Sequence, residues 1–91
     1  MTKKKPENLL IKTCGREYLL TPDMIGDMMT TKQTSVYLSR SMQWVTQTRF
    51  YKNGPPSVKI RHSIFYPKVL VDRWVLDEAR LSQIEDQKKY A

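Results

Sequence analysis

Apolar residues follow two different periods in the C-terminal half of the chain. Residues 58–60 and 64–66 have the sequences Val-Lys-Ile and Ile-Phe-Tyr, which predict two strands joined by a turn at 61–63. After Pro67, which suits the first position of a helix, apolar residues recur at helical spacing: Leu70, Val71, Trp74, Val75, Leu81 and Ile84. This pattern predicts a β-hairpin followed by a helix that continues beyond Leu81.

The N-terminal segment predicts shorter elements. Two short strands are expected at 9–11 and 18–20, with a turn at 14–16 between them. Thr21 is a favourable N-cap and Pro22 a favourable first helical residue, so a short helix should follow. Its apolar face would hold four residues: Met24, Ile25, Met28 and Met29.

The middle of the chain predicts two helices joined by a tight turn. Thr30 or Thr31 can cap the first helix, and Ser39 or Ser41 can cap the second, which is expected over 41–51. The predicted inner side of the second helix holds Met42, Val45, Thr48 and Arg49. The outer side holds Gln43, Thr46, Gln47 and Phe50, with Trp44 on the flank. Gly54 is expected to be left-handed beyond the helix end, and Pro55 and Pro56 stop the helix. These are the parts of a helix-turn-helix.

The charge distribution indicates a polyanionic partner. The net charge is +7, and the stretch between Asp27 and Asp72 has no acidic residue. Its seven basic residues are Lys32, Arg40, Arg49, Lys52, Lys59, Arg61 and Lys68. A field of one sign attracts a polyanion. Nucleic acid is the favoured partner on this ground, ahead of an anionic membrane or a merely solvated basic surface.

The composition argues against an enzyme and against a metal site. Cys14 and His62 are the sole cysteine and histidine, too few for a metal site of Cys and His ligands within one chain or for a Ser/His/Asp or Cys/His set. The glycines are scattered, so there is no phosphate-binding loop. We therefore expect no catalytic residue, metal or cofactor. No apolar stretch approaches a membrane span of about 18 residues and no signal peptide is visible, which favours a cytoplasmic location.

A set of residues in the middle of the chain carries a family resemblance. The set comprises Thr30-Thr31-Lys32-Gln33 before Tyr37-Leu38, Ser39-Arg40-Ser41, Val45, Gly54-Pro55-Pro56, Val58-Lys59-Ile60, Ile64-Phe65-Tyr66, and Leu70 four residues before Trp74. In this order and spacing it resembles the MerR-type winged-helix domain of excisionases, across about half of the chain. The family often has tryptophan at Thr48, glycine at Arg61 and arginine at Phe65, so this chain departs there.

The resemblance implies an α+β fold, a small winged helix-turn-helix with a two-stranded β-hairpin wing and a C-terminal helix. We expect a disordered basic arm at 1–8, in which Lys3, Lys4 and Lys5 could follow phosphates. An N-terminal extension with a short helix is expected at 9–29, the winged domain at 30–85 and a flexible tail at 86–91. Only 17 residues follow Trp74, which favours an excisionase over a full-length effector-sensing regulator.

Candidate DNA contacts follow from the predicted helix and wing. Glutamine can pair with adenine in the major groove, and arginine can enter a narrow minor groove. The expected recognition-helix contacts are Arg40, Ser41, Gln43, Trp44, Thr46 and Gln47. The expected wing and phosphate contacts are Lys32, Lys52, Lys59, Arg61, His62 and Ser63.

Three functions remain open at this point. The first is an excisionase in a bacterial nucleoid, which binds attachment-site repeats in double-stranded DNA, bends them and promotes excision by a tyrosine or serine integrase. Head-to-tail contact between copies, through 9–29 or 78–90, would make its binding cooperative. The second is a small winged-helix transcriptional regulator of a phage or integrative element. The third is a protein-docking module, for example in phage assembly.

Overall fold

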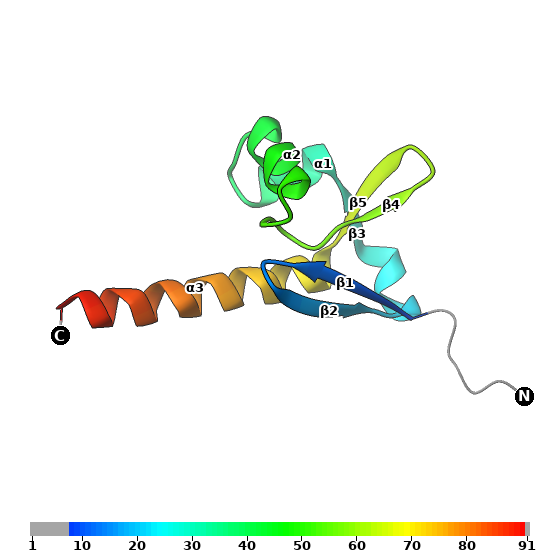
Figure 1. The fold of residues 1–91 in the computed structure, drawn as a ribbon. Helices are drawn as coiled ribbons and strands as arrows, with labels where there is room; N and C mark the ends of the chain where they lie inside the picture. The colour runs from blue at the N-terminus through cyan, green and yellow to red at the C-terminus, as the bar shows by residue number, and fades with distance from the viewer. Residues whose placement is uncertain (1–7, 91) are drawn as a thin grey trace, which may run out of the picture.

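Residues 8–90 of the computed structural model, with side chains described for 8–84, form an α+β fold with two small antiparallel sheets (Figure 1). The elements in chain order are β1 (Leu9–Thr13), β2 (Arg16–Leu20), the 3₁₀ helix η1 (Pro22–Asp27), β3 (Met28–Thr30), α1 (Thr31–Tyr37), α2 (Met42–Phe50), β4 (Val58–Ile60), β5 (Ser63–Pro67) and α3 (Lys68–Tyr90). The predicted arm at 1–8 lies outside the described residues except for Asn8.

The second sheet contains a strand that the sequence pattern did not predict. Its order is β3-β5-β4, so β5 pairs with Val58–Ile60 on one side and with Met28–Thr30 on the other. Met28 and Met29 were expected on a helix and lie in this strand, where Met29 pairs with Tyr66. The predicted hairpin is therefore part of a three-stranded sheet. The short helix before it is a 3₁₀ helix, consistent with the low helix propensity of Gly26.

The core consists of two clusters that share partners. The first contains Ile11, Tyr18, Leu20, Leu70 and Trp74, and the second contains Val45, Tyr66 and Val71. Leu38 and Trp44 are partly buried and pack against both clusters. The segment predicted as an N-terminal extension thus supplies three residues of the first cluster, because the buried face of the β1–β2 hairpin packs against α3. Figure 1 shows the hairpin beside the first half of α3.

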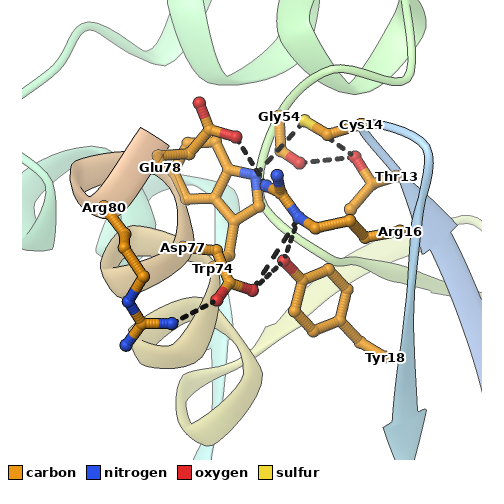
Figure 2. A network of polar contacts seen from close by, with 9 residues as sticks. All are labelled: Thr13, Cys14, Arg16, Tyr18, Gly54, Trp74, Asp77, Glu78 and Arg80. Atoms are coloured by element: carbon orange, nitrogen blue, oxygen red, sulfur yellow. Dashed lines mark hydrogen bonds and ion pairs between the residues drawn. The ribbon is translucent and has the colours of Figure 1, made fainter. Parts of the chain in front are cut away.

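Polar contacts fix this hairpin to α3 (Figure 2). Arg16 Nη2 donates to Glu78 Oε2 at 2.5 Å, and Arg16 Nε donates to the Tyr18 hydroxyl at 2.8 Å. The Tyr18 hydroxyl donates in turn to Asp77 Oδ2 at 2.7 Å. The hydrogen bond that Arg16 donates to Glu78 raises the pKa of Arg16, and burial raises the pKa of Tyr18. The network orients a buried tyrosine at the edge of the first cluster.

α3 continues along the body and then projects beyond it (Figure 1). Leu70, Val71 and Trp74 are buried, whereas Leu81 and Ile84 are about half exposed. Pro67, expected to open this helix, is the last residue of β5, so α3 begins one residue later at Lys68. Within residues 8–90, no helix combines the length and the apolar character that a membrane-spanning segment needs.

At the end of α2 the left-handed residue is Lys52, and not Gly54 as predicted. Lys52 has a φ of 59°, and Gly54 has no positive φ. Lys52 N donates to Arg49 O at 3.0 Å and Asn53 N donates to Thr48 O at 2.9 Å, the pattern of a Schellman motif with lysine at its left-handed position. Gly54 is needed for another reason: a Cβ there would lie 2.3 Å from Thr48 Oγ1 and 2.6 Å from Thr48 Cβ.

Gly54→Ala should therefore destabilise the protein by about 1–3 kcal/mol, the usual cost of overpacking. The clash involves the β-carbon of Thr48, so rotation of its hydroxyl does not relieve it. Gly26→Ala is the matched control, because a Cβ at that position meets nothing within 4 Å. Urea unfolding of the two variants measures the difference, and equal midpoints would show that α2 and the 53–57 loop do not approach as described.

Candidate nucleic-acid interface

Caps on both helices position the turn between them. Thr30 Oγ1 accepts from Gln33 N at 3.1 Å, and Gln33 Oε1 accepts from Thr30 N at 2.9 Å, which completes a capping box at the start of α1. Ser41 Oγ accepts from Trp44 N at 3.0 Å and caps α2. These caps confirm the predicted helix starts. Ser41 therefore has a structural partner of its own, beside the DNA contact expected of it.

The turn itself is a second Schellman motif. Arg40 N donates to Ser35 O at 2.9 Å, Ser39 N donates to Val36 O at 3.1 Å, and Ser39 has a φ of 56°. This motif reverses the chain within Leu38 to Ser41, so that α1 and α2 are joined by a rigid connection. Arg40 lies exposed immediately before α2.

The rotation of α2 places its predicted outer face toward solvent. Val45 is fully buried and is the one buried residue of α2, while Gln43, Thr46 and Gln47 are exposed. Thr48 lies on the inner side, where its hydroxyl donates to Trp44 O at 2.9 Å. The prediction for Met42 was wrong, since it is half exposed. Trp44 and Val45 pack onto the core, whereas the first two residues of α2, Met42 and Gln43, are exposed.

Arg40 and Trp44, two of the expected DNA contacts, also contact each other. The guanidinium carbon of Arg40 lies 4.7 Å from the centroid of the Trp44 ring, the geometry of a cation–π interaction. Trp44 is half-buried and packs against both core clusters. Its ring therefore joins the core to the exposed arginine and restricts where that arginine can move.

The β4–β5 loop has an uncommon backbone. Its two residues are Arg61 and His62, and Ser63, expected in the turn, is the first residue of β5. Arg61 has a φ of 57°, whereas the φ of His62 is not positive. This combination is typical of a type II′ turn, which favours glycine at its first central position. Arg61 thus occupies a position that favours glycine, and its side chain is exposed beside those of Lys59 and His62.

Ion pairs divide the cations of the described side chains into two groups. The pairs formed within residues 8–84 involve Lys12, Arg16, Lys68 and Arg80, which belong to the β1–β2 hairpin and α3. None involves Arg73 of α3 or the remaining basic residues of the acid-free stretch: Lys32, Arg40, Arg49, Lys52, Lys59 and Arg61. The positive charge of α1, α2 and the β4–β5 hairpin is therefore not neutralised by these neighbours.

No family model, curated protein or solved structure matches this chain. The binding chemistry of this region therefore rests on its own side chains. Unpaired cations, amide side chains and a ring-supported arginine are groups that contact phosphates and base edges.

Lys32 and Lys52 lie at different ends of the helical pair. Lys32, in the first turn of α1, borders a cavity of about 560 Å³ together with Met28, Val36 and Lys68. That cavity is mostly apolar, so the site around Lys32 differs in character from the outer face of α2. Lys52 follows α2, on the side of the β1–β2 hairpin.

Two cations outside the predicted set lie beside Lys52. Arg49 was assigned to the inner side of α2 and is half-buried, and Lys12 belongs to β1. All three border one cleft between the hairpin and the end of α2. The helical spacing identified Arg49 as inward-facing, but no local signal connects Lys12 with residues about 40 positions later.

Proposed function

We propose that the chain is a DNA-binding protein in which α1 and α2 act as a helix-turn-helix and β4–β5 acts as its wing. The observation that carries this proposal is the separation of charge. Six cations without an ion pair among the described side chains belong to α1, α2, β4 and the connections that follow these elements, whereas α3 has one such cation, Arg73. The other described cations of the β1–β2 hairpin and α3 form ion pairs. Such a distribution favours a polyanion on one part of the surface.

In this proposal α2 enters the major groove. Gln43, Thr46 and Gln47 point away from the core, and glutamine amides can pair with adenine N6 and N7. Arg40, supported by Trp44, meets a phosphate or a guanine at the N-terminal end of the same helix. Arg61, at the tip of the wing, follows the adjacent minor groove.

The resemblance to excisionases supports a more specific role. The protein would bind repeated sites beside an integrase attachment site, bend the DNA and favour excision. Contact between copies would make binding cooperative, and exposed apolar residues on two segments support such contact. Leu10 and Leu19 pair across β1 and β2 with both side chains about half exposed, and Leu81 and Ile84 are similarly exposed on α3. A copy that uses one patch leaves the other free for the next copy.

A footprint with titrated protein tests this role on the attachment region beside the nearest integrase gene. An excisionase should protect a block that grows in steps, with hypersensitive bands where the DNA bends. Protection of a single promoter operator would instead indicate a transcriptional regulator of the same fold. Absence of protection at moderate salt would contradict DNA recognition and leave a protein-docking function.

Substitutions on α2 and on β4 should have different effects on DNA binding. Gln43→Ala or Gln47→Ala should cost about 1–3 kcal/mol at the true site and relax its sequence preference. Lys59→Ala should weaken all sequences alike and reduce the salt slope by about one. Binding isotherms on the footprinted site and on an unrelated duplex, each over a range of salt, measure both effects. Unchanged binding in all three variants would show that neither this face of α2 nor Lys59 of β4 contacts DNA.

A further inference from the structure

A small cleft lies where the β1–β2 hairpin meets the end of α2 and the loop that leads to β4. Its volume is about 240 Å³, and it is bordered by Lys12, Arg49, Lys52 and Ser57. Pockets that hold drug-sized ligands measure roughly 300–1,000 Å³, so this one suits a smaller group. Three cations, one on β1 and two at the end of α2, therefore border a space of limited size.

The charges around the cleft favour an anion. None of the residues that border it is acidic. Among the described residues, Glu17 pairs with one of the three cations: its Oε2 lies 3.8 Å from Lys12 Nζ, and both side chains are more than half exposed. An exposed pair of this kind contributes little, about 0–1 kcal/mol. The carboxyl end of α2 carries the equivalent of roughly half a negative charge, which stabilises the cations without neutralising three of them.

The walls of the cleft are held in place by hydrogen bonds between distant parts of the chain. Cys14 N donates to Lys52 O at 3.0 Å, and Thr13 Oγ1 donates to Gly54 O at 2.6 Å (Figure 2). Pro55, which also borders the cleft, is buried. The hairpin is therefore fixed to the loop before any ligand arrives, and a preformed site loses less conformational entropy on binding.

We propose that this cleft is a binding site for a phosphate group. Arginine offers a planar fork of donors that matches phosphate oxygens, and lysines add compact positive charge. The phosphate can belong to the backbone of bound DNA, in which case the inference rests on the proposed function. It can also be a free phosphate ion, which does not depend on that function. Either source gives the β1–β2 hairpin a role in binding through Lys12.

Two substitutions that change the charge near the cleft in opposite directions test the site with little risk to the fold. Lys12→Gln removes a cation from the cleft, and Glu17→Gln releases Lys12 from its carboxylate partner. Both side chains are more than half exposed, so neither change should disturb packing. We expect Lys12→Gln to weaken phosphate binding and Glu17→Gln to strengthen it.

The first assay compares thermal unfolding in potassium phosphate with that in potassium chloride at equal ionic strength. At about five times its Kd, bound phosphate should raise the Tm of the wild type by roughly 4–8 °C. Exclusion of phosphate from the protein surface also stabilises the fold, but it acts alike on all variants. The difference between variants is therefore specific to the cleft: the rise should shrink in Lys12→Gln and grow in Glu17→Gln.

The second assay measures the affinity of the same proteins for duplex DNA over a range of salt, with Lys59→Gln as a control. If the ligand is a DNA phosphate, Lys12→Gln should reduce affinity about tenfold near 0.1 M salt and lower the salt slope by about one. If it is a free phosphate, only the Tm assay should respond to Lys12→Gln.

Equal behaviour of Lys12→Gln, Glu17→Gln and the wild type in both assays would overturn the inference. DNA binding that weakens in Lys59→Gln alone would leave the proposed function intact and reject the cleft as a DNA contact. Absence of DNA binding in every protein would reject the proposed function, and the Tm assay would still decide whether the cleft binds phosphate.

Discussion

Replacing Lys52 and Arg61 together by glycine should give a protein that is more stable and binds DNA more weakly. Both residues have φ values near +60° and exposed side chains, so each holds a left-handed conformation that favours glycine. Relief of that strain, less the entropy that glycine adds to the unfolded chain, should stabilise the double variant by about 1–2 kcal/mol in total. Strain kept at two proposed phosphate contacts is typical of residues retained for binding.

The loss of two cations should reduce the affinity for duplex DNA by about 100-fold near 0.1 M salt and lower the salt slope by about two. Urea unfolding and salt-dependent binding isotherms measure the two effects. Ser39→Gly is the matched control, since Ser39 is also left-handed with a φ of 56° and carries no charge. It should gain stability and keep its affinity. A double variant that binds as tightly as the wild type would exclude both side chains from the interface.

Trp74→Ala should have the largest effect on stability. Trp74 is 7% exposed and belongs to the cluster that joins α3 to the β1–β2 hairpin, and its Nε1 donates to Cys14 Sγ at 3.4 Å. Truncating a buried tryptophan costs about 3–5 kcal/mol. A chain of this size has a total stability of roughly 5–14 kcal/mol, so the variant should be partly or wholly unfolded at moderate temperature.

Urea unfolding followed by far-UV circular dichroism measures this loss. Leu76→Ala, on the same helix but 61% exposed, should stay within about 0.5 kcal/mol of the wild type. A loss below about 1 kcal/mol in Trp74→Ala would contradict the packing of the hairpin on α3. It would indicate that the hairpin is an extension outside the packed domain.

The elements that could be predicted are those with local signals. Thr30 with Gln33 forms a capping box, and Ser41 caps α2, so both helix starts followed from residue types within one turn. Strand β4 followed from the alternation of Val58-Lys59-Ile60, and β5 from the run Ile64-Phe65-Tyr66 after the turn. Strand β3 did not, because its two methionines give no marked strand signal. Its pairing with β5 depends on residues more than 30 positions away.

The candidate site was predictable to a similar extent. Helical spacing placed Gln43 and Gln47 on the exposed face and Val45 in the core, as the structure has them. The cation–π contact of Arg40 with Trp44 was not predicted, because spacing gives no side-chain orientation at a helix entrance. Nor was the position of Lys12 beside α2, which depends on how the β1–β2 hairpin packs against α3.

Mapping of bound DNA onto the protein by amide chemical shifts tests the central claim most directly. The duplex should first be selected from a random library with the protein itself, and then titrated at moderate salt. We expect the largest shifts at residues 40–47 and 59–63, the start of α2 and the tip of the β4–β5 hairpin. Shifts confined to β2 and the projecting half of α3, or no shifts at all, would contradict that claim.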